Sequence, residues 1–394
     1  KPEAWDLAGE LGLQEQVINP GAETSHMYIL DGGTPTEVPL APVKFIRSRL
    51  MSGRGKLRML AEPFQPKKSD DSDESLADFV TRRLGREALD KFIGPILGGI
   101  YNTNPDTQSI LVSSPVMREM EAEYGGLFKA AIGKMRKTRK NKIANDEKRP
   151  RFGAFANGLQ ALTDEMVHQL KGDLRLSVET TKIEKVDVSY RLTLSDEETL
   201  SAKSLIFATP ANATAKLLAG VADESASKLA TIAHQNIGTV TLIYREEDVQ
   251  TTFRIHGLMI PRREKRAIDA VTFTSLKMPS RSPKSYGMIR VFFGGGKPDV
   301  AEMSDADLLD TVQDELKSLI GITAEPVQIV PFRWLKSFPQ ADVGHLELVD
   351  EIEKTLPEGI YLAGSSYRGI GVPDCIQQGR QAVKNYVTAR KAIA

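Results

Sequence analysis

The sequence predicts a mixed α/β fold in which two interleaved domains share one chain. Its 394 residues are long for a single hydrophobic core and suit two. From residue 152 onward, short apolar segments alternate with amphipathic ones, which indicates strands alternating with helices. Near the C-terminus, 360–363 predicts a strand, 364–371 a glycine-rich loop and 373–389 a helix.

Composition indicates a globular chain without a global electrostatic partner. Hydrophobic residues make up 41% and charged residues 26%, as is typical of globular proteins. Lys plus Arg and Asp plus Glu are both 52, so the formal net charge is zero. No nucleic-acid partner is expected, because a chain of zero net charge has no overall attraction for a polyanion. Any electrostatic partner would have to bind a local charged patch.

Cysteine usage and hydropathy favour a cytoplasmic protein. Cys375 is the single cysteine, which excludes an internal disulfide and suits a reducing compartment. The apolar segment 92–100 is broken by glycines and a proline and falls short of the ~20 residues of a membrane-spanning helix. The histidines do not pair with Cys or acids at metal-ligand spacing, so no metal site is expected.

Local patterns predict the elements in chain order. Ser75 and Asp78 form a variant capping box, so a helix begins there, and Gly85 ends it. Helices are expected over 4–11, 43–50, 75–85, 86–97, 115–124, 158–170, 210–218, 305–320 and 373–389. Strands are expected over 27–30, 36–40, 174–178, 183–188, 204–208, 238–244, 255–260, 268–276, 286–293, 327–333 and 359–363.

Residues 133–151 form a strongly basic run. A solvated surface loop is the simplest interpretation. The alternative is a patch that faces anionic lipid headgroups, where each basic residue contributes ~1 kcal/mol. The run contains no interleaved aromatic residues, which argues against single-stranded nucleic acid.

The loop 364–371 carries the strongest chemical signal. A strand, a glycine-rich loop and a helix start follow in that order, with Pro373 in the first turn. This order gathers unpaired N–H groups and partial positive charge at one point, which favours an anion or a polarised carbonyl. An ordinary tight turn that needs glycine for its backbone angles would also explain these residues.

The run 361–382 resembles the C-terminal flavin segment of the protoporphyrinogen/coproporphyrinogen oxidase family. Other stretches of this chain are similar to that family as well, and together they cover nearly all of it. They are 97–101 with 104–106, 155–159, 205–211, and 334–340 with 343–345.

The resemblance implies a flavoprotein of the amine-oxidase fold. An FAD-binding Rossmann-like domain, built from discontinuous pieces, would carry an inserted substrate domain. Residues 1–150 would lie mostly in the substrate domain, with a helical region at about 75–145 that could touch a membrane surface. The FAD domain would take 151–220 and 331–394, and the substrate-domain sheet 221–330.

The resemblance also implies FAD as the cofactor. A helix start aimed at the N1–C2 edge of the flavin would stabilise the reduced ring. The implied cofactor contacts are Thr180, Ala208, Trp334, Gly364, Ile370, Gly371, Val372 and Asp374. The substrate candidates are His26, Arg47, Gly99 and Tyr101. No catalytic side chain is assigned, because flavin N5 does the chemistry, and Cys375 is interpreted as a packing residue.

The implied reaction is the oxidation of a porphyrinogen in heme biosynthesis, with O₂ as acceptor and H₂O₂ as product. The form of 369–375 is closest to that of Gram-positive-type enzymes, which favours coproporphyrinogen III over protoporphyrinogen IX. Another oxidase or desaturase of this fold, or a non-catalytic porphyrin-binding fragment, remains an alternative. A homodimer and a peripheral contact with the inner face of the cell membrane are further candidates.

Members of the family begin with a strand, Gly-x-Gly-x-x-Gly and a helix. Residues 1–394 contain no such segment, and the first residues match the family just after it. We therefore expect the natural N-terminus to lie upstream of Lys1 and the FAD domain of this sequence to be incomplete at its N-terminus.

Overall fold

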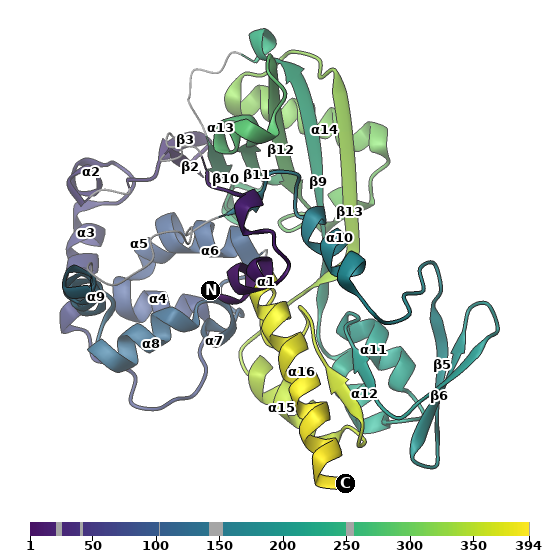
Figure 1. The fold of residues 1–394 in the computed structure, drawn as a ribbon. Coiled ribbons are helices and arrows are strands. Elements are labelled where there is room, and N and C mark those ends of the chain that lie inside the picture. The colour runs from purple at the N-terminus through teal and green to yellow at the C-terminus, as the bar shows by residue number, and fades with distance from the viewer. Residues whose placement is uncertain (21–25, 40–41, 102, 142–152, 250–255, 394) are drawn as a thin grey trace. The chain divides into compact units, whose positions relative to one another are not determined.

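The computed structural model describes residues 1–20, 26–39, 42–101, 103–141, 153–249 and 256–393 (Figure 1). Contacts divide the chain into two compact units. Unit 1 comprises Lys1–Val17, Asn157–His234 and Pro339–Ala394, and unit 2 comprises Ile18–Ala156 and Gln235–Phe338. The chain therefore enters each unit more than once, as the interleaved prediction requires.

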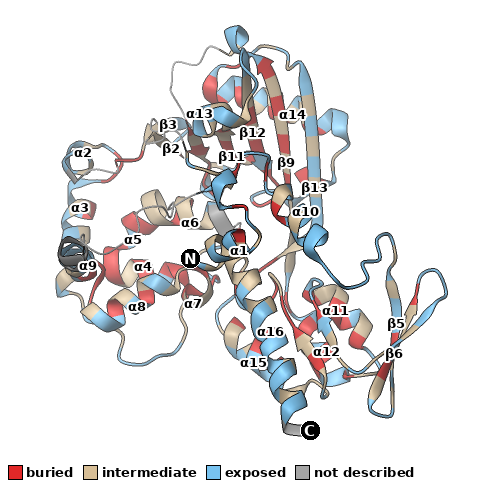
Figure 2. Cartoon of the chain, viewed as in Figure 1, coloured by how far each residue is buried: buried red, intermediate tan, exposed pale blue. Residues whose placement is uncertain are grey.

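Unit 2 contains a seven-stranded sheet of order β13-β9-β12-β11-β10-β2-β3. Alternate residues of β9 are buried, and α14 (Asp305–Ile320) contributes Val312 and Leu316 to the same core (Figure 2). β10 pairs in parallel with β2 and antiparallel with β11. The next two pairs, β11 with β12 and β12 with β9, are also antiparallel. The strands are β2 (Met27–Asp31), β3 (Thr34–Glu37), β9 (His234–Arg245), β10 (Gly257–Met259), β11 (Ile268–Phe273), β12 (Tyr286–Phe293) and β13 (Gln328–Pro339).

The other part of unit 2 is helical and is held by a buried ion pair. Arg83 of α4 and Glu62 are fully buried and pair with each other. Glu62 also accepts the backbone N–H groups of Leu127 at 2.8 Å and Phe128 at 3.1 Å, so it caps the start of α9. The helices are α2 (Pro42–Arg47), α3 (Gly53–Leu60), α4 (Leu76–Leu84), α5 (Arg86–Ala88), α6 (Gly94–Tyr101), α7 (Ile110–Ser113), α8 (Pro115–Tyr124), α9 (Leu127–Asn141) and the short α13 (Thr274–Lys277).

Unit 1 is built around two parallel strands, β8 (Leu205–Phe207) and β14 (Ile360–Leu362). Helices α11 and α12 and helix α15 pack with them into one core that includes Leu218, Leu229 and Val349. A separate antiparallel sheet contains β5 (Thr180–Val186), β6 (Ser189–Leu194) and β7 (Thr199–Ala202). The helices are α1 (Glu3–Glu10), α10 (Gln160–Gln169), α11 (Ala211–Leu218), α12 (Asp223–Ala230), α15 (His345–Thr355) and α16 (Val372–Ile393).

Several predicted elements are confirmed. The predicted helix 305–320 coincides with α14. The Ser75 hydroxyl accepts the Asp78 N–H at 3.0 Å, so Ser75 caps α4 as predicted, and it also donates to the Asp78 carboxylate at 2.8 Å. The expected strand, loop and helix near the C-terminus are β14, 363–371 and α16.

Other predicted elements are wrong or incomplete. Residues 174–178 form no strand, because 174–177 are exposed and Ser177 has φ of +59°. The strand predicted over 268–276 ends at Phe273, where α13 begins. The start of the basic run, 133–141, is the end of α9 and not a loop, whereas 142–151 lie outside the described residues.

Boundaries between the units also differ from those predicted. β13 continues to Pro339, so Trp334 belongs to unit 2 and not to the C-terminal segment. Residues 223–230 form α12 in unit 1, where we had expected the substrate-domain sheet to begin. The first residues belong to unit 1, because α1 packs on α16: the Arg380 guanidinium lies 2.6 Å from the Glu10 carboxylate.

Candidate functional site

The glycine-rich loop begins where the two parallel strands of unit 1 end. Leu362 lies opposite Phe207, and the Ala363 N–H donates to the Phe207 carbonyl at 2.9 Å. Gly364 follows with φ of +121°, and a Cβ added there would lie 3.5 Å from the Ala208 carbonyl oxygen. The carboxyl ends of parallel strands are where ligands bind in α/β proteins.

The start of α16 presents backbone donors. Among the described residues, the N–H groups of Ile370, Gly371, Val372 and Asp374 have no hydrogen-bond acceptor. The Cys375 N–H is the first in this turn to bond back, to the Gly371 carbonyl at 3.0 Å. Unpaired donors together with the positive end of the helix dipole suit a carbonyl that gains negative charge.

The conformation of this turn depends on glycine and on one carboxylate. Gly369 has φ of +126°, which side-chain-bearing residues rarely adopt. A Cβ on Gly371 would lie 2.7 Å from the Asp374 carboxylate, so this side chain folds back against the loop. The Asp374 carboxylate pairs with Lys1, which neutralises it and leaves the backbone donors of the turn as its main polar groups.

Buried hydroxyl groups anchor the loop to α11. The Ser366 hydroxyl accepts the Ala211 N–H at 3.1 Å, and the Tyr367 hydroxyl lies 3.1 Å from the Thr214 hydroxyl. Ser366 and Tyr367 are both almost fully buried. Burial raises the pKa of Tyr367 to about 12, so its hydroxyl stays protonated and can serve as a donor.

Two histidines hold the same loop from the other side. His345 Nε2 donates to the Tyr367 carbonyl at 2.8 Å. His234 Nδ1 lies 2.9 Å from the Ile232 carbonyl and must donate to it, so Nε2 accepts from the Ser366 hydroxyl at 3.2 Å. Burial lowers the pKa of both histidines, which favours the neutral rings that this pattern requires.

A cavity of about 750 Å³ lies beside the loop anchor in unit 1. It is lined by Thr180 and Thr181 of β5, by Ile206 and Ala208 at β8, and by Leu217 of α11, among others. Because a Cβ on Gly364 would touch the Ala208 carbonyl, the predicted contacts Thr180, Ala208 and Gly364 belong to one region. Sequence reasoning placed these residues separately, and the fold of unit 1 brings them together.

The groups that hold the loop carry no signal in the sequence. His234, Ser366 and Tyr367 carried no predicted role, and His345 was noted only as part of a Gly-His stretch. Burial was the missing information, since a hydroxyl or an imidazole in a sequence does not reveal whether it is enclosed. For Cys375, burial raises the pKa of the thiol, which fits a packing residue and not an activated thiolate.

The remaining predicted contacts lie in unit 2. The Trp334 ring on β13 lies 4.4 Å from the Phe332 ring. Gly99 lines a cavity of about 210 Å³, and a Cβ there would collide with the end of the Met259 side chain. His26 Nδ1 lies 3.1 Å from the Glu37 carboxylate, and Arg47 is exposed at the end of α2.

Of the four substrate candidates, only Gly99 is among the described residues that line this cavity. Tyr101 ends α6, and its side chain is outside the described part of the structure. The cofactor and substrate contacts predicted for these residues, and those predicted for the residues of unit 1, stay predictions.

The family model of flavin-containing amine oxidoreductases matches residues 1–385. The chain belongs to this family. It is an oxidoreductase, and its cofactor is FAD. No helix within the described ranges is long and apolar enough to cross a membrane.

Known relatives of this flavoprotein include porphyrinogen oxidases. The chain is 30% identical to the coproporphyrinogen III oxidase of Bacillus subtilis over 98% of its own length and 84% of that protein. It is 26% identical to the enzyme of the same name from Staphylococcus aureus, over 97% and 85%. A solved structure from Exiguobacterium, provisionally described as a protoporphyrinogen oxidase, matches with a TM-score of 0.83 at 25% identity, over 98% of this chain and 84% of that one.

The residues present in unit 1 fit a flavin. The unpaired N–H groups of 370–372 supply donors of the kind that the ring's carbonyl edge requires. The positive φ at Gly364 leaves backbone exposed where a Cβ would otherwise stand, and the cavity at Thr180 and Ala208 offers room for further parts of a dinucleotide.

Proposed function

We propose that this flavoprotein oxidises a porphyrinogen to the porphyrin, with coproporphyrinogen III as the preferred substrate and O₂ as the electron acceptor. The observation that carries the proposal is the 30% identity to the B. subtilis coproporphyrinogen III oxidase over 98% of this chain. The glycine-rich loop at the start of α16 supports it, because its free donors suit a flavin.

In this proposal unit 1 binds FAD and unit 2 binds the substrate. The backbone at Thr180 and Ala208 would hold the dinucleotide arm, and Gly364 would lie against the ring system. The N–H groups of Ile370, Gly371 and Val372 would face its carbonyl edge, with Asp374 shaping the turn. Bound FAD supplies the acceptor for each hydride taken from the macrocycle.

The chain itself contributes fixed positions for the reacting groups and a favourable electrostatic environment at the carbonyl edge of the ring. Donors that are fixed before reaction stabilise developing negative charge without the cost of reorienting. The anchors at Ser366, Tyr367 and His345 keep these donors fixed. Aromatisation of the product drives the reaction, so no strong side-chain base is needed.

The test uses the full-length protein loaded with FAD. Coproporphyrinogen III and protoporphyrinogen IX are supplied separately in air, and porphyrin fluorescence and H₂O₂ are followed together. We expect both porphyrin and H₂O₂ to form, faster with coproporphyrinogen III. Faster turnover of protoporphyrinogen IX would overturn the substrate preference, and turnover of neither would overturn the proposal.

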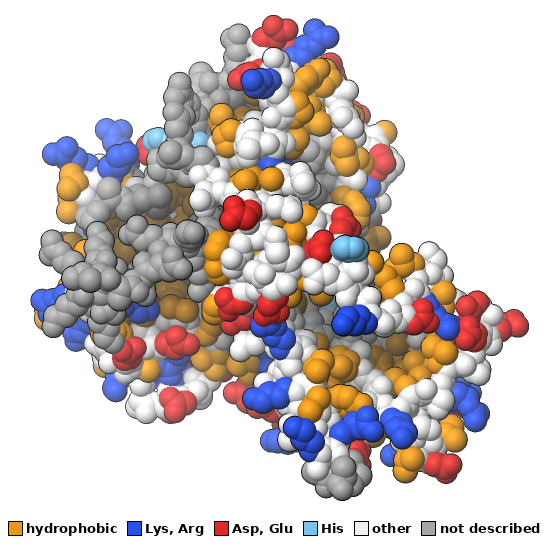
Figure 3. Space-filling view, viewed as in Figure 1, with side chains coloured by type: hydrophobic (Ala, Val, Ile, Leu, Met, Phe, Trp, Pro, Cys, Tyr) orange, Lys and Arg blue, Asp and Glu red, His pale blue; other side chains and the backbone are white. Residues whose placement is uncertain are grey.

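We further propose that unit 2 touches an anionic membrane face at the helices α2, α3 and α9. Leu57 and Leu60 lie on α3 and Phe64 lies in the short turn that follows it, and Leu57 and Phe64 are 69% and 86% exposed. Ile132 and Met135 repeat this pattern on α9, between basic residues. Figure 3 shows lysine or arginine side chains beside hydrophobic ones where Figure 1 places α2.

Such an arrangement suits a headgroup boundary, because apolar side chains enter the lipid while basic ones meet its charge. The proposed location is therefore the cytoplasm, with reversible attachment to the inner face of the cell membrane.

A further inference from the structure

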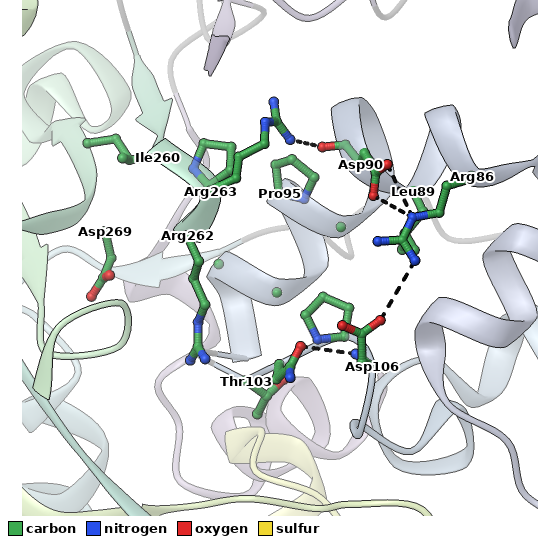
Figure 4. A pocket seen from close by; sticks show the side chains of 16 residues that line it. Arg86, Leu89, Asp90, Pro95, Thr103, Asp106, Ile260, Arg262, Arg263 and Asp269 are labelled. Atoms are coloured by element: carbon green, nitrogen blue, oxygen red, sulfur yellow. Dashed lines mark hydrogen bonds and ion pairs between the residues drawn. The ribbon is translucent and has the colours of Figure 1, made fainter. Parts of the chain in front are cut away.

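A small cavity lies entirely within unit 2, between α6 and the turn after β10 (Figure 4). Its volume is about 210 Å³. Gly94, Gly98 and Gly99 form one wall and contribute no side chain, so space is left along the helix. Apolar atoms of Leu89, Pro95 and Ile260 complete this wall, and Figure 4 shows Arg262 extending into the space in front of it.

Two of the three arginines at this cavity are held by groups at its rim. Arg86 is exposed, and its Nε lies 2.9 Å from the Asp90 carboxylate. The Arg263 guanidinium lies 3.1 Å from the Asp31 carboxylate and donates to the Asp90 backbone carbonyl. Figure 4 shows Arg86 directed toward the Asp90 and Asp106 carboxylates and Arg263 toward the Asp90 backbone carbonyl.

Arg262 is placed differently. Its guanidinium lies 3.4 Å from the side-chain carbonyl of Gln235 and interacts electrostatically with the Asp269 carboxylate, and the residue remains accessible to solvent. A guanidinium carries five donors in a planar fork, so it can hold a carboxylate in addition to the neighbours it already has.

The acidic groups around this arginine do not prevent an anion from entering. Both carboxylate oxygens of Asp269 accept N–H groups at 2.7 Å, from Gly295 and Gly296. Burial raises the pKa of Asp269. The Asp90 carboxylate is balanced by Arg86, and the Asp106 carboxylate lies 4.0 Å from that same guanidinium.

We propose that this cavity is a carboxylate subsite in which Arg262 binds one propionate arm of the tetrapyrrole. The inference rests on the proposed function, because coproporphyrinogen and its product carry such arms. The cavity is too small for the ring system, since sites for drug-sized ligands occupy about 300–1,000 Å³. It has room for a side arm whose methylene groups lie on the glycine face while the carboxylate meets the guanidinium.

Binding of the product gives a direct test. The probe is coproporphyrin III, titrated onto the FAD-loaded full-length protein and followed by quenching of porphyrin fluorescence. We expect Arg262→Gln to weaken binding about 10-fold or more, the size of a lost charge-assisted hydrogen-bond pair. Arg262→Lys keeps the charge but not the fork, and should recover part of the loss.

Arg266→Gln is the matched control. Arg266 belongs to the same turn, but its Nε lies 2.7 Å from the Glu315 carboxylate and it does not line the cavity. This variant should bind coproporphyrin III within about 2-fold of wild type, a difference well under the tenfold step. Thermal unfolding of all variants shows whether a weaker binder is still folded. The tetramethyl ester of coproporphyrin III, added in mild detergent, has no free carboxylate, so its binding should not depend on Arg262.

Kinetics provide a second measurement. Arg262→Gln should raise KM for coproporphyrinogen III and leave kcat nearly unchanged, because the arm is bound equally in the ground and transition states. If wild type turns over this substrate and Arg262→Gln behaves like it, the subsite is wrong while the proposed function stands. If wild type neither binds the porphyrin nor oxidises the porphyrinogen, both proposals fail.

Discussion

The imidazole of His345 donates from Nε2 to the carbonyl oxygen of Tyr367 at 2.8 Å, inside the core of unit 1. This bond joins the first residue of α15 to the loop that precedes α16. Because Tyr367 also contacts Thr214 through its hydroxyl, the loop is held at both its backbone and its side chain. The position of the α16 donors therefore depends on a neutral histidine.

Stability should fall as the pH falls below the usual histidine range. Burial lowers the pKa of His345 and His234 in the folded protein, so the unfolded chain binds protons first. Their contribution is complete above the unfolded pKa of about 6.5 and decreases as the pH drops toward the folded values. Thermal unfolding between pH 8 and pH 5 measures this.

His345→Gln should flatten part of that pH dependence, because the amide can still donate to the Tyr367 carbonyl but cannot titrate. His168→Gln is the control, since His168 lies exposed on α10. If the pH dependence of thermal unfolding is the same in His345→Gln as in wild type, other groups cause the loss of stability at low pH.

Gly364→Ala should weaken both the fold of the loop and the retention of FAD. A Cβ at φ of +121° is strained, and strained positions of this kind cost on the order of 1–3 kcal/mol. Denaturant unfolding and flavin retained after gel filtration measure the two effects. Gly379→Ala in α16 is the matched control, because open space surrounds it and alanine should stabilise the helix by about 0.5–1 kcal/mol.

Arg83→Met should destabilise unit 2 strongly. Arg83 and Glu62 are both fully buried, and removing one member of a buried pair typically costs about 3–5 kcal/mol. Urea unfolding of Arg83→Met and of Lys182→Ala should differ by several kcal/mol, because exposed pairs such as Lys182 with Glu184 contribute ~1 kcal/mol or less. A loss in Arg83→Met no larger than that of Lys182→Ala would contradict the prediction.

Binding to lipid vesicles should depend on the exposed apolar side chains of α3 and of the short turn that follows it. The full-length protein should co-sediment with vesicles containing phosphatidylglycerol, less so at high salt, and little with phosphatidylcholine alone. Leu57→Ser with Phe64→Ser should reduce this binding several-fold. Val188→Ser, at an equally exposed position of unit 1, should not; equal binding by all three proteins would exclude the proposed contact.

Local patterns in the sequence were sufficient for elements whose cause is local. The helix 305–320 follows from apolar spacing and a capping serine, and the order of β14, loop and α16 follows from an apolar run, glycines and Pro373. The pattern failed at 174–178, where apolar residues alternate but are exposed and gain nothing from pairing. Alternation indicates a strand only when a partner surface exists to bury one face.

The sequence by itself determined the flavin-type loop, the fold class and the family resemblance, because each depends on residues that are neighbours in the chain. Only the tertiary structure decided which distant residues share a site. The pairing of β8 with β14 brings Ala208 to Gly364, and the packing of α6 against β10 places Arg262 in the same cavity as Gly98 and Gly99. These arrangements arise from burial and long-range hydrogen bonding, which depend on the whole fold and leave no short-range pattern in the sequence.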